Sequence, residues 1–336
     1  MKLLRKILIP IVPFYFLVTW LRNWLYDKGF KKSLSYTFPI ICVGNLSVGG
    51  TGKTPMIEYL IRLLKDNYSL ATLSRGYGRK TKGFILGDKN SSSSSIGDEP
   101  LQFYKKFDDI LVAVDADRQN GIELIRSKHP VDVILLDDAF QHRKVKAGLN
   151  LLLTSFDNLY SEDILLPTGD LREPKSGSNR ADIIIVTKCP ANISETNQKH
   201  IFNSLKLKSH QKLFFSWIDY DNFIYGDGIK QELSSLIHLE VALVTGIANP
   251  TPFLDYLTTS KVNYKHFKFA DHHNFTDADI IKLKKEEIIL TTEKDYVRLA
   301  PYFKGASTRL YYLPIRFVIN QEKLFNQQIM GFLESY

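Results

Sequence analysis

The sequence predicts a doubly wound α/β fold with a second, smaller α/β domain and an apolar N-terminal helix. Three observations support this fold class: short apolar runs alternate with helical patterns, one glycine-rich stretch stands between such a run and a helix, and the N-terminus is both basic and apolar. The length of 336 residues leaves room for about two domains. With 44% hydrophobic and 24% charged residues, the composition excludes a disordered or fibrous chain.

The N-terminal segment, residues 1–33, combines positive charge with apolar side chains. Residues 1–32 carry seven basic side chains and one acidic one, a net charge of +6, whereas the other 304 residues are nearly neutral at +2. The apolar run 7–21 has 15 residues, fewer than the 18 or so of a spanning helix, and no small-residue cleavage site of a signal peptide follows it. Its tryptophans and flanking cations suit a membrane surface. We therefore expect a membrane-associating helix, with a helix packed on the protein's own core as the alternative.

Downstream of this segment, nine apolar runs predict β-strands. Several are apolar throughout, as expected for parallel strands that are buried on both faces. Helical patterns stand between the runs, which is typical of a doubly wound sheet. The predicted strands are Ile40–Val43, Leu70–Leu73, Ile110–Val114, Val131–Leu136, Leu149–Leu153, Ile183–Val186, Leu213–Trp217, Val241–Val244 and Ile288–Leu290. The predicted helices include Met56–Lys65, Arg118–Lys128 and Asp277–Lys285.

We expect the chain to divide into three parts. Residues 1–33 form the N-terminal segment, 34–216 the larger domain and 217–336 the smaller α/β domain, which follows a strand linker. The boundary is placed at Trp217–Gly228, where the chain becomes polar and aromatic. Within the larger domain, the five serines Ser91–Ser95 predict a flexible surface loop.

The strongest chemical signal follows the first predicted strand and reads Ser47-Val-Gly-Gly-Thr-Gly-Lys-Thr54. It matches the phosphate-loop pattern G-x-x-x-x-G-K-[ST], with Ser47 in the place of the first glycine. Glycines let backbone N–H groups turn toward an anion, and the start of the next helix adds a positive dipole end. Lys53 is expected to reach the β- and γ-phosphates, and the Thr54 hydroxyl to bind Mg²⁺. The stretch predicts a P-loop NTPase-like domain whose nucleotide-binding residues are Ser47, Val48, Gly49, Gly50, Thr51, Gly52, Lys53 and Thr54.

A second magnesium ligand is expected at the end of a neighbouring strand. The run that begins at Val131 ends in Asp137 and Asp138, which we expect to share the metal ion and its waters. An ordinary strand-end turn would also account for two acids at this place. The nucleotide is predicted to be ATP, because Thr187-Lys-Cys-Pro190 carries a proline where the guanine-specific N/T-K-x-D pattern needs an aspartate.

Three further polar clusters have active-site character, although none is specific by itself. Ser74-Arg-Gly-Tyr-Gly-Arg79 follows the second predicted strand, at the edge where α/β sheets bind ligands. Gly97-Asp-Glu-Pro100 opens a helix, and Asp271-His-His273 falls in a loop before the helix that starts at Asp277. The ordinary explanations are a surface loop, first-turn acids of a helix and surface histidines. No third ligand stands at a spacing that would let the histidines bind zinc.

Taken together, the motifs resemble those of the tetraacyldisaccharide 4'-kinases, a family of lipid A biosynthetic enzymes. The resemblance extends from the basic N-terminus to about Arg298. Serine at position 47 is within the family's pattern, whereas Ala139 replaces a glycine and leaves the two preceding acids in place. The matching motifs are, in order, Val43-Gly-Asn-Leu-Ser-Val-Gly-Gly-Thr-Gly-Lys-Thr-Pro55, Ser74-Arg-Gly-Tyr-Gly78, Gly97-Asp-Glu-Pro100, Asp137-Asp-Ala-Phe-Gln-His142, Leu171-Arg-Glu-Pro174, Asp271-His-His273 and Thr292-Glu-Lys-Asp295.

The resemblance implies an ATP-dependent kinase that phosphorylates the 4'-hydroxyl of an acylated glucosamine disaccharide 1-phosphate. It implies Asp98 as the base that accepts the hydroxyl proton, with His272 as its partner and His273 as the alternative partner. Lys53 and Mg²⁺ are expected to neutralise the phosphate charge. The expected magnesium ligands are Thr54, Glu99, Asp137 and Asp138. The expected substrate contacts are Arg75, Tyr77, Arg118 and His273.

The expected partners are the lipid substrate and a membrane surface. A four-chain lipid does not leave a bilayer readily, because each buried CH₂ is worth roughly 0.8 kcal/mol. The resemblance therefore implies work at the cytoplasmic face of the bacterial inner membrane, with the protein peripheral or anchored by its N-terminus. Cys42 and Cys189 cannot build a disulfide framework, which agrees with a reduced compartment.

Two other classes of P-loop protein are alternatives. A nucleic-acid-binding ATPase would spread its positive charge over the body, which is nearly neutral here. A P-loop switch protein would normally carry the guanine-specific pattern and would need no base for an acceptor hydroxyl. We expect no nucleic-acid partner, and the sequence makes no obligate protein partner evident.

Overall fold

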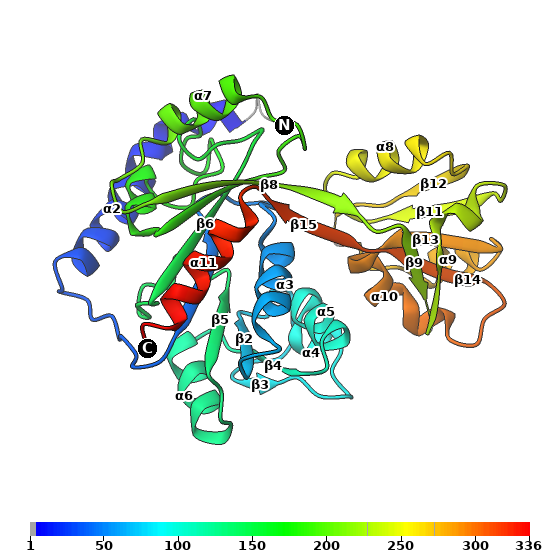
Figure 1. The fold of residues 1–336 in the computed structure, drawn as a ribbon, viewed down its shortest axis with the longest axis horizontal. Helices are drawn as coiled ribbons and strands as arrows, with labels where there is room; N and C mark the ends of the chain where they lie inside the picture. Colours follow the sequence, from blue (N-terminus) through cyan, green and yellow to red (C-terminus); the bar gives the residue numbers. More distant parts are fainter. Residues whose placement is uncertain (1–4, 227, 272) are drawn as a thin grey trace.

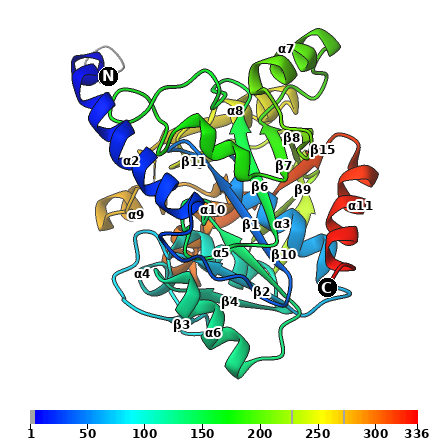
Figure 2. The same cartoon turned by 90° about the vertical axis from the view of Figure 1, so that its left-hand side faces the viewer.

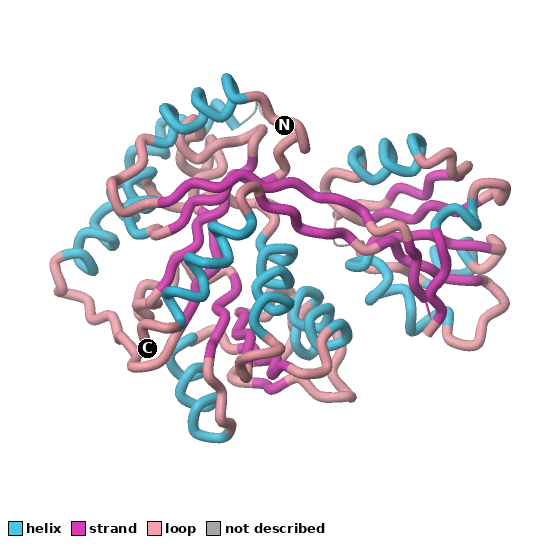
Figure 3. Tube along the Cα trace, in the orientation of Figure 1, coloured by secondary structure: helices cyan, strands magenta, loops and turns pink. Residues whose placement is uncertain are grey.

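The computed structural model describes residues 5–226, 228–271 and 273–336. Strands among these residues form one sheet of nine strands and one of six. The two sheets lie in separate lobes that are joined by two long strands (Figure 1). The colouring by secondary structure in Figure 3 shows helices packed around the strands in each lobe. The predicted α/β architecture with a smaller second lobe is confirmed.

The larger sheet has the order β15-β8-β7-β6-β1-β5-β2-β4-β3. The strands from β8 to β4 are parallel, whereas β15 and β3 pair antiparallel at the two edges. Because β1 lies between β5 and β6, the loop after β1 opens beside the carboxyl end of β5. The strands are β1 (Ile40–Asn45), β2 (Leu70–Ser74), β3 (Ile85–Leu86), β4 (Ile110–Val114), β5 (Val133–Asp137), β6 (Leu149–Ser155), β7 (Ile183–Thr187), β8 (Lys212–Tyr220) and β15 (Ile315–Ile319).

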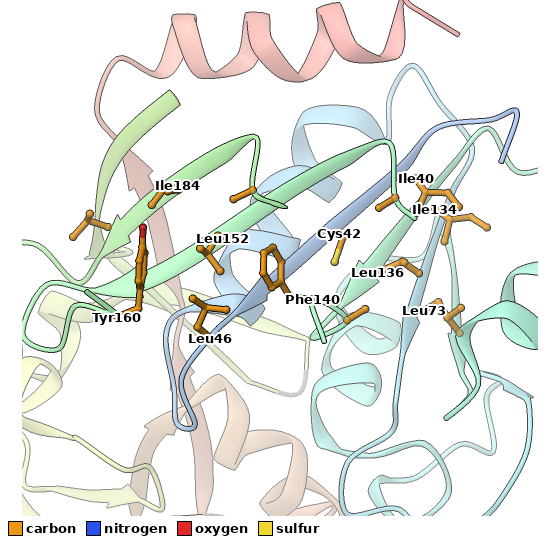
Figure 4. Packing of buried hydrophobic residues seen from close by; sticks show 14 of the residues in the cluster. Ile40, Cys42, Leu46, Leu73, Ile134, Leu136, Phe140, Leu152, Tyr160 and Ile184 are labelled. Atoms are coloured by element: carbon orange, nitrogen blue, oxygen red, sulfur yellow. The ribbon is translucent and has the colours of Figure 1, made fainter. Parts of the chain in front are cut away.

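Helices cover both faces of this sheet, so successive residues of its central strands enter two different cores. Along β1, Ile40 and Cys42 belong to one cluster, and Ile41 and Val43 belong to the other. Figure 4 shows the first cluster, in which Cys42 lies near Phe140. Burial on both sides explains why several strand sequences are apolar throughout. The helices of this lobe are α3 (Lys53–Leu64), α4 (Ser93–Ile96), α5 (Asp98–Lys106), α6 (Arg118–Lys128), η2 (Lys175–Arg180), α7 (Glu195–Leu205) and α11 (Glu322–Leu333).

The serine run contains the short helix α4, so the prediction of a flexible loop over Ser91–Ser95 is wrong. The backbone N–H of Ser92 donates to Ser95 Oγ at 2.8 Å, which caps the helix, and Ile96 at its end is buried. The Ser95 carbonyl accepts a hydrogen bond from Thr81 Oγ1 at 2.6 Å. These contacts give a polar run a defined structure that its composition does not reveal.

The smaller sheet has the order β10-β9-β14-β13-β11-β12. Its strands β14, β13, β11 and β12 are parallel, and the hairpin of β9 and β10 adds antiparallel pairs at one edge. The strands are β9 (Phe223–Gly226), β10 (Ile229–Glu232), β11 (Val241–Thr245), β12 (Tyr264–Lys268), β13 (Ile288–Thr292) and β14 (Arg309–Leu313). The helices are η3 (Leu233–Leu236), α8 (Thr251–Thr259), α9 (Asp277–Leu283) and α10 (Glu293–Phe303).

The linker between the lobes consists of two antiparallel strands. The first part of β8 pairs with β7, while residues 216–220 pair with β15 as the chain returns from the smaller lobe. Helix α11 then packs on the larger lobe, where the Phe325 ring lies 5.7 Å from Tyr59 and 5.2 Å from Phe214. The expected smaller domain 217–336 therefore covers too much, since β15 and α11 belong to the larger lobe. The amphipathic sequence of α11 predicts a helix with one apolar face but does not indicate which lobe that face packs against.

The N-terminal segment forms a 3₁₀ helix η1 (Lys6–Ile11) and the helix α2 (Val12–Asp27), which lie along the outside of the larger lobe (Figure 2). Residues 7–27 make a 21-residue helix whose most apolar 18 residues have a mean hydropathy of 1.3, so it is long and apolar enough to cross a membrane by length and composition. Residues 22–27 extend the helix beyond the predicted apolar run 7–21. Only 6% of these most apolar 18 residues is buried against the rest of the protein.

Candidate active site

The P-loop runs from the end of β1 to the start of α3. Gly52 at the start of α3 has a φ of +84°, a left-handed conformation that favours glycine. Behind it, Thr187 Oγ1 donates to the Thr51 carbonyl at 2.9 Å, and Asn45 Nδ2 donates to Thr51 Oγ1 at 2.7 Å. On the other side, a Cβ added to Gly49 would meet no described atom within 4 Å. The loop is thus held by β1 and β7 while its glycine backbone and the N-terminus of α3 remain accessible to a phosphate chain.

Two carboxylates stand beside this loop at the end of β5. Burial raises the pKa of Asp137 to about 6, and the negative charges of Asp138 and Glu99 add to this effect, while Lys53 opposes it. Burial also acts to raise the pKa of Asp138. However, Lys53, whose Nζ lies 3.7 Å from Asp138 Oδ1, and Arg172 outweigh burial and hold that pKa below its ordinary value. The two neighbouring acids therefore have different proton affinities, and Asp138 is the one paired with cations.

The charge distribution at the end of β5 fits a divalent cation. Asp137 Oδ2 accepts a hydrogen bond from Ser74 Oγ at 3.1 Å, whereas Asp137 Oδ1 is buried without a hydrogen-bond partner among the described residues. A buried carboxylate oxygen without a partner is costly unless a cation or a proton binds it. Within the described residues, no group of three or more His, Cys, Asp or Glu side chains could hold a metal ion. A site with fewer protein ligands suits Mg²⁺, which uses one or two carboxylates together with substrate phosphates.

The segment that follows residue 165 closes the P-loop from the side of Ser47 and Val48. The Val48 N–H donates to the Asp170 carbonyl at 2.7 Å, and Ser47 forms an isolated β-bridge with Leu171. The next residue, Arg172, donates to Asp138 Oδ1 at 2.9 Å and to the Asn45 carbonyl at 3.1 Å. The motif Leu171-Arg-Glu-Pro174 indicated that this region matters. The sequence did not show that Arg172 binds Asp138, which is 34 residues away.

Helix α5 brings Asp98 and Glu99 to the boundary between the lobes. Asp98 Oδ2 accepts hydrogen bonds from Arg298 Nε at 3.0 Å and Nη2 at 2.6 Å. Glu99 Oε1 lies 3.3 Å from Lys294 Nζ. Both cations belong to α10 of the smaller lobe, in and after the motif Thr292-Glu-Lys-Asp295. Sequence reasoning singled out this motif without assigning its cations to the acids of α5.

The residues expected to contact the substrate lie in different environments. Arg75 is exposed, and Tyr77 is 77% exposed, both in the loop after β2. Arg118 is buried instead, and its guanidinium donates to the carbonyls of Asp115 at 2.9 Å and Asp137 at 3.3 Å. Burial lowers the pKa of Arg118, although the charge of Asp137 opposes this shift. Arg118 therefore supports the end of β5 from behind.

The two histidines of the Asp271-His-His273 motif have separate outcomes. His272, the expected partner of Asp98, lies outside the described residues. His273 packs in the smaller lobe, where its ring stacks on Phe269 with a centroid distance of 4.8 Å. Its Nε2 lies 3.0 Å from Asp279 Oδ2, at the start of α9. This contact of His273 is with a helix cap and not with Asp98.

Comparisons with known proteins agree on one family. The sequence profile described as tetraacyldisaccharide-1-P 4'-kinase matches residues 4–334. The tetraacyldisaccharide 4'-kinase of Flavobacterium johnsoniae is 52% identical, with an alignment that covers 100% of this chain and 99% of the relative, and that of Bacteroides fragilis is 47% identical, covering 94% and 89%. The crystal structure of LpxK from Aquifex aeolicus in complex with ATP superposes with a TM-score of 0.82 at 32% identity, covering 98% of this chain and 99% of that chain. The chain is a member of the tetraacyldisaccharide-1-P 4'-kinase family.

Proposed function

We propose that this chain transfers the γ-phosphoryl group of ATP to the 4'-hydroxyl of an acylated glucosamine disaccharide 1-phosphate, a step of lipid A biosynthesis. The observation that carries the proposal is the meeting of three elements at one sheet edge: the P-loop, the acids at the end of β5 and the acids at the start of α5. Such an edge supplies phosphate binding, metal binding and an acceptor for the hydroxyl proton. Membership of the family directs this chemistry to a lipid disaccharide.

The phosphate chain of ATP binds the P-loop residues Ser47 to Thr54 in this proposal. Lys53 leaves its contact with Asp138 and reaches the β- and γ-phosphates, where its charge opposes the charge that builds up during transfer. The N-terminus of α3 and the backbone N–H groups of the loop add fixed positive ends. Arg172 lies close enough to Asp138 to bring a second cation to the same edge.

Thr54 and Asp137 would hold the Mg²⁺ ion directly, and Asp138 and Glu99 would bind its waters. Two observations support this assignment: Asp137 Oδ1 has no hydrogen-bond partner in the described part of the chain, and the Glu99 charge acts on the Asp137 pKa. When bound, Mg²⁺ neutralises phosphate charge and orients the phosphate chain. Glu99 exchanges its contact with Lys294 for this role, whereas Ser74 keeps the Asp137 carboxylate oriented.

Asp98 is the proposed base. A sugar hydroxyl is a poor nucleophile at neutral pH, so a positioned carboxylate that accepts its proton in the transition state accelerates transfer. Asp98 stands at the N-terminus of α5 next to Glu99, on the side of the site that faces the smaller lobe. His272 is proposed to assist Asp98, and Arg75 and Tyr77, on the loop after β2, are proposed to contact the disaccharide.

The exposed face of α2 is proposed to bind the membrane surface. Phe14 is 70% exposed and Leu17 is 53% exposed, yet the opposite face is attached to the catalytic lobe. There, Tyr15 OH donates to the Arg172 carbonyl at 2.9 Å, and Asn23 Nδ2 donates to Glu173 Oε2 at 2.6 Å. A helix that crosses the bilayer would lose these contacts. We therefore propose that α2 lies in the interface of the cytoplasmic leaflet and brings the site to headgroup depth.

The function is tested with γ-labelled ATP, Mg²⁺ and the tetraacylated disaccharide 1-phosphate in detergent micelles. The expected result is label in the lipid, located at the 4'-position by mass spectrometry of the dephosphorylated and intact product. Label released only as inorganic phosphate would favour the P-loop switch protein. ATP hydrolysis that rises with DNA or RNA and leaves the lipid unlabelled would favour the nucleic-acid-binding ATPase.

Membrane binding is tested separately by replacing exposed side chains of α2 while keeping its attachment to the lobe. The triple variant Phe14→Ser, Leu17→Ser and Leu21→Ser should shift the protein from sedimenting vesicles of anionic phospholipid to the supernatant. The reason is that it removes apolar side-chain area that the membrane would bury. The matched control is Ile281→Ser, which removes a 63% exposed apolar side chain from the smaller lobe. Equal sedimentation of the triple variant and the wild type would refute the membrane role of α2.

A further inference from the structure

The geometry points to Arg298 as a positioning residue for phosphoryl transfer: from the smaller lobe, it fixes the Asp98 carboxylate in the orientation that accepts the proton of the acceptor hydroxyl. This inference rests on the proposed function and on the role of Asp98 in it. It adds a requirement that the large lobe alone cannot meet. The base belongs to one lobe, and the group that orients it belongs to the other.

The contact between Arg298 and Asp98 is tight and directional. Nε and Nη2 of Arg298 both donate to a single oxygen, Asp98 Oδ2, at 3.0 and 2.6 Å. Charge-assisted hydrogen bonds of this kind are roughly twice as strong as neutral ones. The side chain of Arg298 is 8% exposed and that of Asp98 is 19% exposed, so water screens the pair weakly. Two donors on one oxygen restrict rotation of the carboxylate.

A second carboxylate holds Arg298 from behind. Arg298 Nη1 lies 3.4 Å from Asp295 Oδ1, one helical turn earlier, and Asp295 is fully buried. Asp295 Oδ2 accepts hydrogen bonds from the Gly246 N–H at 2.9 Å and from Thr292 Oγ1 at 2.8 Å. A Cβ at Gly246 would lie 2.9 Å from Asp295 Oδ1, so a glycine at this position lets the backbone approach the Asp295 carboxylate closely. The ends of β11 and β13 thus fix Asp295, which fixes the guanidinium.

The attachment of the two lobes has a separate cation at the other end of α5. Lys106, the last residue of α5, lies 2.7 Å from Glu58 Oε2 on α3 and also contacts Glu293 on α10. The Glu58 side chain is 3% exposed and that of Glu293 is 9% exposed, so this cluster is a buried link between the lobes. Docking of α10 on α5 therefore does not depend on Arg298 alone. The location of Arg298 at the reactive end of the same helix indicates a role in orienting Asp98.

During transfer, the acceptor oxygen forms a bond to the γ-phosphorus while the bond from that phosphorus to the β,γ-bridging oxygen breaks and ADP leaves. The hydroxyl proton passes to Asp98, which returns it to solvent after product release. Arg298 exchanges no proton and no bond in this step. Because a misplacement of about 1 Å at a reacting group can cost roughly 10²-fold in rate, an arginine that fixes the carboxylate affects kcat more than binding.

The test compares Arg298→Ala, Arg298→Lys and the control Lys106→Gln in the lipid kinase assay with the full-length protein. Arg298→Ala should lower kcat by about 10²-fold while the KM values for ATP and lipid change by less than about 3-fold. Millimolar guanidinium should restore much of this kcat, and Arg298→Lys should give an intermediate kcat, because lysine keeps the charge without the fork. Lys106→Gln should lower the melting temperature, keep kcat within about 3-fold and show no rescue by guanidinium.

The inference is overturned if Arg298→Ala keeps kcat within about 3-fold of the wild type. It is also overturned if Lys106→Gln loses kcat equally and guanidinium restores neither variant, since Arg298 would then serve only to dock the lobes. If Arg298→Ala does not fold, the Arg298→Lys kcat decides between these outcomes. A wild-type protein that leaves the lipid unlabelled would instead contradict the proposed function, which separates the two failures.

Discussion

The two lobes meet at helix α5, and at the N-terminal end of this helix acids of the larger lobe face cations of the smaller lobe. The larger lobe contributes acids at the ends of its elements, Asp98 and Glu99 on α5 and Asp137 on β5, beside the P-loop. The smaller lobe contributes cations from one helix, Lys294 and Arg298 on α10, each paired with an acid of α5. The larger lobe therefore carries the groups that we propose bind the metal and accept the proton, whereas the smaller lobe holds two of those groups, Asp98 and Glu99, through ion pairs.

Without the smaller lobe, the acids Asp98, Glu99 and Asp137 would concentrate negative charge next to the P-loop, where the phosphates of ATP would add further negative charge. The cations of α10 offset that charge, and they belong to an element that the linker of β8 and β15 carries. Docking of the smaller lobe and the readiness of the acids are therefore coupled through the same ion pairs.

The largest effect is expected for the chemistry of the larger lobe. Asp98→Ala should lower kcat by about 10²- to 10⁴-fold while ATP affinity is nearly kept, because a base acts only in the transition state. Lys53→Ala should lower kcat and also raise the KM for ATP, because in the proposed mechanism Lys53 contacts the phosphates both in the bound substrate and in the transition state. Steady-state kinetics with lipid in micelles measures both. An Asp98→Ala enzyme that turns over near the wild-type rate would refute the role of Asp98.

Asp98→Asn is the matched variant for this comparison. It keeps the volume of the side chain and an acceptor oxygen for Arg298, but the amide cannot accept the hydroxyl proton. Its kcat should fall with that of the alanine variant. A normal kcat in Asp98→Asn would show that the position supports structure and not proton transfer.

A smaller effect is expected when a cation of the smaller lobe is removed. Lys294→Gln frees Glu99 from its ion pair, so the Mg²⁺ concentration for half-maximal activity should fall. The change should stay below about 5-fold, because a partly exposed pair is worth at most about 1 kcal/mol. The control is Lys304→Gln, an exposed lysine directly after α10. A rise in the Mg²⁺ requirement of Lys294→Gln would show that Lys294 helps Glu99 bind the metal.

The smallest effect concerns the stability of the smaller lobe. Hydrogen bonds from His273 and Thr276 lower the pKa of Asp279 to about 2. A lowered pKa means that the carboxylate stabilises the fold fully above its unfolded pKa of about 3.8 and loses this effect as the pH falls toward 2. Asp279→Asn should therefore melt about 2 °C below the wild type at pH 7, with a gap that narrows below about pH 4. Its kcat at pH 7 should not change.

Calorimetry of the two proteins across this pH range checks the prediction. A gap that stays constant down to pH 3 would mean that the Asp279 charge contributes nothing to the cap of α9. A lower kcat in Asp279→Asn at pH 7 would instead place His273 in the active site, where the sequence suggested it.

Much of the larger lobe could be predicted because its strands are buried on both faces. Ile183–Val186 is a continuous apolar run, Leu149–Leu153 is interrupted only by Asn150, and each run begins at the first residue of a strand. In the smaller lobe, β12 escaped prediction because Tyr264–Lys268 has only Phe267 buried and pairs with β11 alone at an edge. An edge strand needs little apolar sequence, since solvent satisfies one of its sides.

The residues of the candidate site also fall into those that the sequence places and those that only the fold places. The P-loop and Asp137 lie at the ends of their strands, so local pattern and strand order suffice to place them. Arg298 acts on a residue 200 positions away, and no spacing in the sequence relates the two. His272 and His273 are neighbours that their sequence does not distinguish, and the fold assigns His273 to a helix cap.

The sequence by itself determined the chemistry of the larger lobe, the family and the charged, apolar N-terminus, because these depend on motifs and periodicities within a few tens of residues. The tertiary structure alone decided which cations face which acids, that β15 and α11 return to the larger lobe, and that α2 is attached by one face and exposed on the other. These features depend on contacts between elements distant in sequence, and such contacts form only when the lobes pack and buried charges must find partners.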